Sequence, residues 1–177
     1  MGKEVQIINT NMRESFQKNL DTYKVDYRLL GDIFYISSSM KNKALLIKIL
    51  VLLNFERNLI YVNIANEKTT RTLEGGCYLR KVITLDDKKN PKVEIDAISQ
   101  TRLVYDPTHP DAMRDGVREG YVEYPNVCVQ SEMFNLTEVN NEINTILEII
   151  KKIDPSIIIP QNDTKFEEFL LKQVNNQ

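Results

Sequence analysis

Apolar residues recur at helical spacing in a first long segment of the chain. The steps between them alternate between four and three residues, and Arg57 is the one position that breaks the pattern. The members of this seam are Leu46, Leu50, Leu53, Ile60 and Ile64. Such spacing aligns side chains along one side of an α-helix, so we predict a helix over residues 39–70. Both flanks of the seam are also apolar, near Ile49 and Leu52, so this helix needs more than one neighbour.

A second segment has the clearest helical pattern in the sequence. Its apolar seam consists of Leu136, Val139, Ile143, Ile146 and Ile150. The same alternation of three and four predicts a helix over residues 128–153, with a seam of coiled-coil type shorter than three heptads. Lys151 and Lys152 suit the negative end of a helix dipole, and Pro155 cannot continue the helix.

Between these helices the apolar spacing changes to that of β-strands. Short runs around residues 78–85, 93–97, 103–105 and 121–127 read as strands, and Gly75 and Gly76 mark a turn. Residues 106–120 have the composition of a loop, and Pro125 ends the last strand or puts it at an edge. We therefore predict a small β module over residues 71–127.

The predicted fold class is α+β. Two long helices, near the two ends of the chain, form a helical or coiled-coil layer, and the β-rich module is inserted between them. Residues 1–38 form an N-terminal extension whose pattern assigns no element, and residues 154–177 form a tail with a short helix expected around residues 165–174.

Composition removes several classes of protein from consideration. The chain has 177 residues, a net charge of -2 and a pI of about 5.6, so no strong positive field is present to attract nucleic acid. The mean hydropathy is -0.35, and the apolar run at residues 44–53 is about half the length that a membrane span requires, so we expect no integral membrane segment. The N-terminus lacks the pattern of a cleavable secretion signal.

The sequence offers little catalytic chemistry. His109 lies near Asp106, Asp111 and Asp115, which could be drawn as a metal site. Because Asp-Pro, His-Pro and Asp-Gly pairs are typical of turns, we interpret the cluster as a loop instead. No phosphate-binding glycine motif and no nucleophile with a base occurs. We expect no enzyme activity, no cofactor and no metal.

The two cysteines leave two alternatives open. Cys77 and Cys128 are far apart in the sequence and do not have the spacing of a metal site. They could pair in an oxidising compartment or remain separate thiols that behave as small apolar residues. We favour separate thiols.

Two stretches contain motifs of a known family. In the first stretch the motif residues are Asn63, Ile64, Ala65, Asn66, Thr70, Arg71, Thr72, Gly75, Gly76 and Tyr78. In the second they are Asp106, Pro107, His109, Pro110, Gly120, Tyr121, Val122, Tyr124, Pro125, Asn126, Val127, Glu132 and Met133. Together and in this order, they resemble the proximal rod proteins of the bacterial flagellar basal body, the family designated by the letter C within the rod and hook superfamily. The chain departs from the family at Val62, in its first 38 residues and in a shorter final helix.

The resemblance implies a structural subunit of the flagellar rod, which transmits motor torque to the hook and filament. It also implies export through the flagellar type III apparatus into the periplasm, with this chain and other rod proteins as partners. The two apolar seams would then be the assembly interface, and their helices would become ordered when neighbouring subunits cover them. The alternative is a small adaptor or binding protein whose helices pair within one chain or a dimer.

Overall fold

The computed structural model describes residues 4–8, 14–30, 33–88, 90–160, 165, 166 and 168. The chain divides into two units, which are described one at a time. Unit 1 comprises residues 1–55 and 137–177, and unit 2 comprises residues 56–136. The two long helices, α2 (Met40–Ala65) and α3 (Val129–Ile153), each contribute to both units. The expected helix around residues 165–174 falls mostly outside the described residues.

The N-terminal part of unit 1 contains a small sheet that the sequence pattern left unassigned. Its elements are β1 (Glu4–Ile8), α1 (Glu14–Thr22), β2 (Tyr27–Leu30) and β3 (Ile33–Ser37), and the strand order is β1-β3-β2 with antiparallel pairing. Phe16 of α1 packs edge-on against Phe34 of β3, with ring centroids 5.6 Å apart. Leu20 and Ile36 are also fully buried, so α1 and the sheet share an apolar core.

Asn42 fixes the start of α2 to this sheet. Its side chain accepts a hydrogen bond from the Asp26 backbone N–H at 3.0 Å and donates to the carbonyls of Asp26 and Ser37 at 2.9 and 2.8 Å. The Ser39 hydroxyl accepts from the Asn42 N–H at 3.1 Å, as expected of an N-terminal helix cap. These contacts determine where the helix begins.

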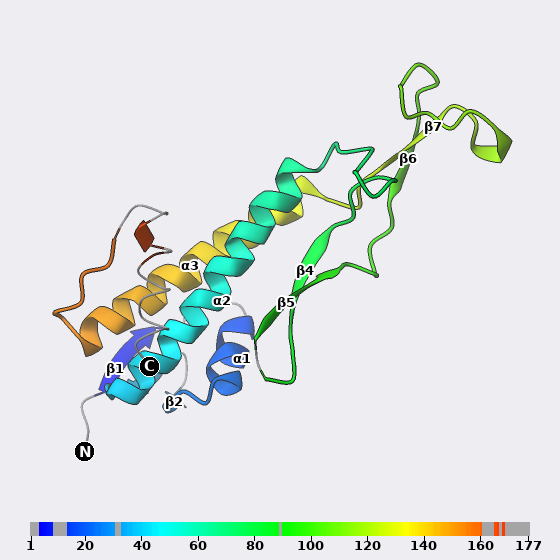
Figure 1. Cartoon of the computed structure of the whole chain (residues 1–177). Helices are drawn as coiled ribbons and strands as arrows, with labels where there is room; N and C mark the ends of the chain where they lie inside the picture. Colours follow the sequence, from blue (N-terminus) through cyan, green and yellow to red (C-terminus); the bar gives the residue numbers. More distant parts are fainter. Residues whose placement is uncertain are drawn as a thin grey trace. The chain divides into compact units, whose positions relative to one another are not determined.

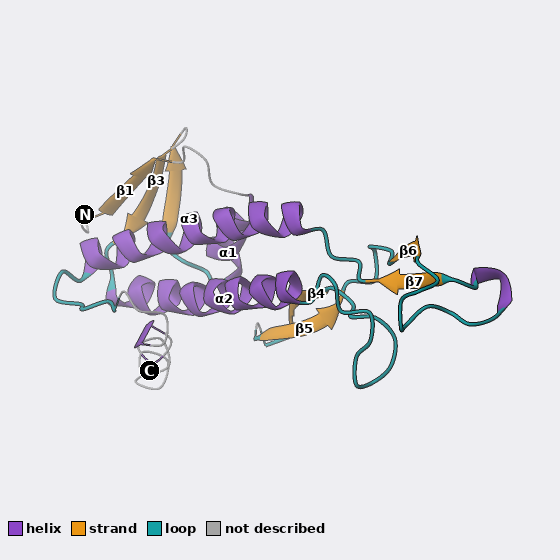
Figure 2. Cartoon of the chain, turned by 90° about the horizontal axis from the view of Figure 1, so that it is seen from above, coloured by secondary structure: helices purple, strands orange, loops and turns teal. Residues whose placement is uncertain are grey.

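Within unit 1 the helices α2 and α3 lie side by side and antiparallel, as two perpendicular views show (Figures 1 and 2). An ion pair joins the first turn of α2 to the residue after α3, with Lys43 Nζ 2.5 Å from Asp154 Oδ2. The hydrogen bond from Lys43, followed by that from Ser156, lowers the pKa of Asp154 to about 2. The contact therefore favours the antiparallel arrangement over most of the pH range.

Unit 2 contains two separate antiparallel hairpins and not one continuous sheet. One consists of β4 (Lys81–Leu85) and β5 (Pro91–Ile95), and the other of β6 (Arg102–Tyr105) and β7 (Tyr121–Tyr124). A short 3₁₀ turn, η1 (Gly116–Arg118), lies in the loop before β7. The predicted mixed α+β class is confirmed, whereas the predicted coiled-coil layer stays a prediction.

The ends of the long helices follow local chemistry. α2 ends at Ala65, before the predicted boundary at residue 70, and the Asn66 side chain donates back to the Val62 carbonyl at 2.8 Å. α3 ends at Ile153, next to Asp154-Pro155. Among the helices that the structure describes, none combines the length and apolarity needed to cross a membrane.

Candidate functional site

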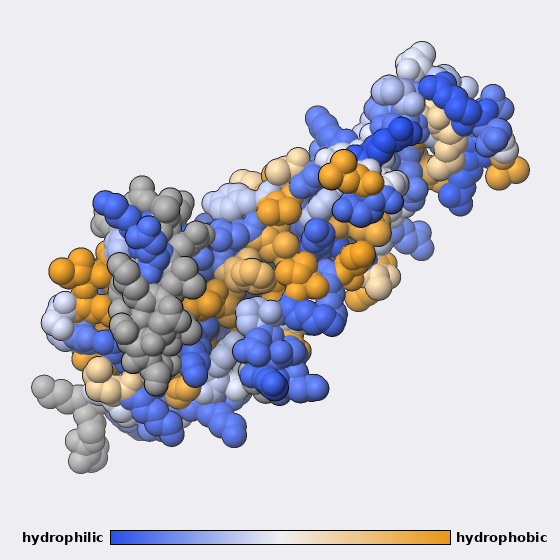
Figure 3. Space-filling view, in the orientation of Figure 1, coloured by the Kyte–Doolittle hydropathy of each residue, from blue (hydrophilic) through white to orange (hydrophobic). Residues whose placement is uncertain are grey.

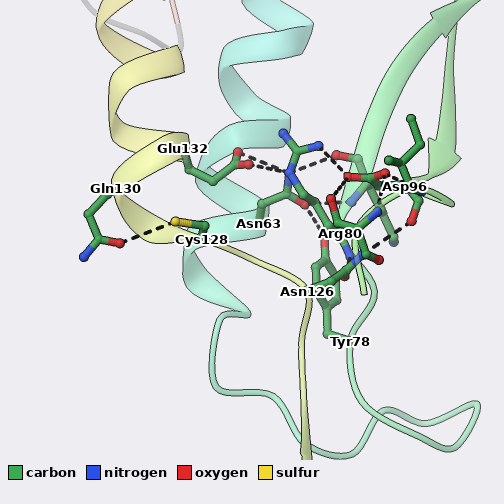
Figure 4. Close-up of polar contacts among 11 residues, drawn as sticks. Asn63, Tyr78, Arg80, Asp96, Asn126, Cys128, Gln130 and Glu132 are labelled. Carbon is green, nitrogen blue, oxygen red and sulfur yellow. Dashed lines mark hydrogen bonds and ion pairs between the residues drawn. The ribbon is translucent and has the colours of Figure 1, made fainter. Parts of the chain in front are cut away.

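A cluster of polar side chains joins the helix ends of unit 2 to the first hairpin. We call it the polar junction, and it consists of Asn63, Tyr78, Arg80, Asp96, Asn126 and Glu132 (Figure 4). These residues come from the end of α2, the segment before β4, the turn after β5, the segment before α3, and the first turn of α3. The polar junction thus brings together residues from both predicted family stretches.

The Asn63 side chain uses its full hydrogen-bonding capacity. Its oxygen accepts from the Tyr78 hydroxyl at 2.8 Å and from the Lys81 backbone N–H at 3.0 Å. Its nitrogen donates to the Lys81 carbonyl at 2.9 Å and to Glu132 Oε2 at 3.4 Å. An amide has two donors and two acceptor positions, and a side chain only 1% exposed needs them all paired. Asn63 therefore holds the first residue of β4 against the end of α2.

Arg80 pairs with both carboxylates of the polar junction. Its Nε lies 2.6 Å from Glu132 Oε1 and its Nη1 lies 3.1 Å from Asp96 Oδ2. Glu132 is fully buried, so its charge depends on this partner. Burial disfavours the charged guanidinium, but the hydrogen bonds and charges of Glu132 and Asp96 outweigh it and raise the pKa of Arg80. The pairing of Arg80 with Asp96 has no local signal in the sequence.

Asp96 also organises the turn that follows β5. Its carboxylate accepts hydrogen bonds from the Ile98 backbone N–H at 2.9 Å and from the Ser99 hydroxyl at 2.8 Å. These bonds, with a further contribution from Arg80, lower the pKa of Asp96 to about 2. The aspartate is therefore ionised at neutral pH and remains paired with Arg80.

Asn126 explains the Pro-Asn turn ahead of α3. Its side-chain oxygen accepts from the Arg80 backbone N–H at 2.6 Å. Its nitrogen donates to the carbonyls of Ser99 and Asp96 at 3.0 and 3.4 Å. The residue is buried, so these bonds fix the turn to the segments on either side of the first hairpin.

A second group of contacts joins two loops of unit 2. The Thr70 hydroxyl donates to Asp111 Oδ2 at 2.8 Å, and Arg71 Nε lies 2.8 Å from Asp111 Oδ1. Glu67 forms an ion pair with Arg102 at 3.1 Å. This loop cluster connects the segment after α2 with the loop between β6 and β7, so the two family stretches also meet here.

Gly120 is a family-motif position with a specific steric reason. Its φ angle is +78°, a conformation that residues with a side chain rarely adopt, and an added Cβ would lie 2.6 Å from a ring carbon of Tyr105. Tyr105 packs against Tyr121 with ring centroids 5.2 Å apart. A glycine therefore allows the chain to enter β7 beneath the Tyr105 ring.

The other motif residues have local roles. Gly75 and Gly76 have positive φ angles of 93° and 72° in a loop where the Thr72 N–H donates to the Gly76 carbonyl at 2.8 Å. The Asp106 carboxylate accepts from the hydroxyl and backbone N–H of Thr108 within its own turn. The remaining positions divide by exposure. Those buried are Val122, Pro125 and Val127, those half-buried are Ile64 and Tyr124, and those exposed are Ala65, Pro107, Pro110, Tyr121 and Met133.

The predicted assembly seams are largely buried within the single chain. Leu46, Leu50 and Leu53 of α2 are 0% exposed, as are Val139, Ile146 and Ile150 of α3. Ile60, Leu136 and Ile143 are also buried, and Ile64 is half-buried. Other apolar side chains of the same helices remain exposed, among them Phe55, Tyr61, Val62, Met133 and Phe134. Figure 3 shows apolar surface along α2.

Within the described ranges, no group of three histidine, cysteine, aspartate or glutamate residues is placed to hold a metal ion. At His109, where a metal site was the alternative to a loop, the side chain forms a turn contact. His109 Nδ1 accepts a hydrogen bond from the Asp111 backbone N–H at 3.1 Å. Cys77 is buried and Cys128 is exposed, and both are free thiols. Burial raises the pKa of Cys77, which keeps it protonated at neutral pH.

The chain is similar in sequence to a known flagellar protein. No family model matches the chain. The chain is 35% identical over 96 residues to the flagellar basal-body rod protein FlgC of Borreliella burgdorferi (strain ATCC 35210 / DSM 4680 / CIP 102532 / B31). The similarity is to a flagellar rod protein. It covers 42% of this chain, and the chain spans 63% of the length of that relative.

The similarity to FlgC confirms the resemblance predicted from the two motif stretches. That relative is a protein of the flagellar basal-body rod. The groups of the polar junction and the loop cluster are bonded to one another and so hold segments of the chain in place.

Proposed function

We propose that this chain is a divergent flagellar rod protein of the C family and a structural subunit of the basal-body rod. The observation that carries this proposal is its similarity to FlgC over 96 residues. The polar junction supports it, since residues of both motif stretches, such as Asn63 and Glu132, bond to each other although they are far apart in the sequence.

In the proposed rod the chain transmits motor torque between neighbouring subunits toward the hook and filament. Torque transmission requires that a load on the hairpins reaches the helices without loosening the connection. The polar junction suits this task because Asn63, Arg80 and Asn126 each bond to backbone or charge on more than one segment. The proposal includes export through the flagellar type III apparatus and a periplasmic location.

Assembly through the apolar seams is part of this proposal. Because Leu50 and Ile146 are already fully buried in one chain, assembly through the seams would exchange contacts within the chain for contacts between chains. The exposed side chains Tyr61, Val62 and Phe134 are available on the same helices without such an exchange.

The experiment that tests the proposal is quantitative mass spectrometry of hook–basal bodies purified from the native organism. We expect this chain at a fixed stoichiometry relative to the other rod proteins. Its clear absence from a preparation that contains those proteins would leave the similarity as a record of common ancestry only.

A second candidate function is an adaptor whose helices pair within one chain. The burial of Leu46, Leu53 and Ile150 in a single chain favours it, because these seam residues are covered without any neighbouring subunit. The same purified basal bodies distinguish the two functions, since an adaptor would be absent from the rod.

A further inference from the structure

The hairpin of β4 and β5 has one mostly apolar and one mostly polar face. The residue pairs Ile83–Val93 and Leu85–Pro91 share one face, because directly opposed residues point to the same side of a sheet. Ile95 and Lys81, which lie opposite each other at the end of the hairpin, belong to this face too. The exposed fraction is 39% for Val93 and 56% for Ile95, so the apolar face is open at β5.

The outer edge of β5 carries backbone groups that β4 does not use. The Asp96 N–H donates to the Arg80 carbonyl and the Asp86 N–H donates to the Asn90 carbonyl. Since hydrogen-bonded positions alternate along an antiparallel strand, the backbone groups of Pro91, Val93 and Ile95 face outward. Among the described residues no further strand pairs with this edge, because β4 and β5 form a two-stranded sheet.

The charge pattern of β5 is complementary to itself. The strand reads Pro-Lys-Val-Glu-Ile, with Val93 at its centre, Lys92 on one side and Glu94 on the other. If a second copy lies antiparallel with Val93 opposite Val93, Lys92 of each copy faces Glu94 of the other. A shift of the register by two residues instead places Lys92 opposite Lys92 or Glu94 opposite Glu94, which is destabilising.

We propose that β5 is a docking edge for a second copy of this chain, joined by antiparallel pairing about a two-fold axis through Val93. The Val93 N–H of each copy donates to the Val93 carbonyl of the other, and the Ile95 N–H donates to the Pro91 carbonyl. Pro91 has no N–H and therefore leaves no donor unpaired. The product is a four-stranded sheet in which the apolar faces of both hairpins become continuous.

The two-fold symmetry determines where this dimer can exist. An isologous contact closes after two copies, whereas a polar rod grows by heterologous contacts that repeat along its length. The β5 dimer is therefore a state of the chain outside a rod. This inference does not depend on the proposed rod function, because the edge and its charges are properties of unit 2 alone.

Sedimentation velocity of the full chain over a concentration series tests the dimer. We expect weak, concentration-dependent dimerisation, since one short strand buries little surface. Lys92→Glu and Glu94→Lys each replace an attractive contact by a repulsive one on both sides of the axis, so each variant should dimerise about tenfold or more weakly.

Mixing these two variants provides the decisive control. In the mixture every cross-strand contact joins opposite charges again, so a heterodimer should form while each variant alone stays monomeric. Lys92 and Glu94 also pair within the chain at 2.7 Å, and mixing cannot restore that pair. Recovery on mixing therefore reports the contact between copies.

Amide hydrogen exchange provides an independent readout. The Val93 and Ile95 amides should exchange more slowly as the protein concentration rises, whereas the Glu94 amide, which faces β4, should not respond. A chain that stays monomeric over the concentration series, or a dimer that persists unchanged in both charge variants, overturns the proposal.

Discussion

Asn63 shows at the scale of one residue how a sequence motif acts in this fold. The Asn-Ile-Ala-Asn stretch contains two asparagines with different surroundings: Asn63 is 1% exposed, whereas Asn66 is half-buried at the end of its helix. Only Asn63 bonds to β4 and α3. The first asparagine is therefore the one that connects segments, and the second caps the helix end.

We expect Asn63→Asp to destabilise unit 2 by about 2–4 kcal/mol. The substitution removes the donor to the Lys81 carbonyl and places a second negative charge beside buried Glu132. The matched control is Asn66→Asp, which we expect to cost much less. The Lys81 amide, which donates to Asn63, should exchange faster with solvent in the first variant only. Equal effects of the two substitutions would contradict the assigned roles.

Two glycines with the same φ angle allow the cost of backbone strain to be measured separately from the cost of a steric clash. Gly116 and Gly120 both have a φ of +78°, but only at Gly120 would an added Cβ meet another atom, the Tyr105 ring. We expect Gly116→Ala to cost roughly 1–2 kcal/mol from backbone strain, and Gly120→Ala to cost about 1 kcal/mol more. Urea unfolding followed by near-ultraviolet circular dichroism measures both. If the two variants lose equal stability, the clash with the Tyr105 ring does not contribute to the free energy of unfolding.

The low pKa of Asp96 leads us to expect that the free energy of unfolding depends on pH in the acid range. Its pKa is about 2 in the folded chain, below the ordinary value of 3.8, so ionised Asp96 stabilises the fold above pH 3.8. This stabilisation is lost as the pH falls from about 4 to 2. We therefore expect the difference in unfolding free energy between the wild type and Asp96→Asn to narrow over that range. A constant difference would show that Asp96 keeps its ordinary pKa.

At the scale of elements, the long helices are defined by their seams, and the seams are used within the chain. The seam positions Leu50 and Ile146 are fully buried, whereas Tyr61 and Phe134 on the same two helices are exposed. The apolar period thus identified the buried side of each helix. It did not identify what covers that side, because a helix shows the same apolar spacing whether it packs against another part of its own chain or against a neighbouring subunit.

A charge placed in the seam tests its burial. Ile146→Asp puts a carboxylate where the side chain is 0% exposed, so we expect unit 1 to lose about 3–5 kcal/mol of stability. The control Asn144→Asp adds the same charge to the exposed side of α3 and should cost little. Far-ultraviolet circular dichroism during thermal unfolding compares them. An Ile146→Asp chain as stable as the control would place that position outside the core.

At the scale of the whole molecule, the two proposed functions differ in the state of the helices before any assembly. The burial of Leu53 and Val139 predicts that the purified chain is already helical along both seams. This differs from the expectation that the helices become ordered only when neighbouring subunits cover them.

Amide hydrogen exchange of the purified chain decides between these states. We expect slow exchange at Leu46, Leu50, Ile146 and Ile150, because their helices are packed in a single chain. Residues 73–76, in the exposed loop after α2, provide an internal reference for fast exchange. Exchange along the seams as fast as in that loop would show that the seams are covered only on assembly.

The sequence predicted the long helices better than the N-terminal region. The seams span many turns, and a period repeated that often has few alternative explanations. The strands β1, β2 and β3 are five residues or shorter and mix polar with apolar side chains, so no period could be established. Their assignment depends on pairing with one another and on packing against α1.

The sequence by itself determined the α+β class, the two helical seams, the turn at Gly75-Gly76 and the resemblance to rod proteins, because each depends on neighbouring residues or on a short motif. Only the tertiary structure decided that Arg80 pairs with both Asp96 and Glu132, and that Asp111 joins Thr70 to the second loop. The partners in these pairs lie far apart along the chain, and the sequence contains many other polar residues that could form equally good hydrogen bonds and ion pairs. Folding decides which of these pairs form, because a charged side chain that becomes buried can pair only with the groups that the fold places next to it.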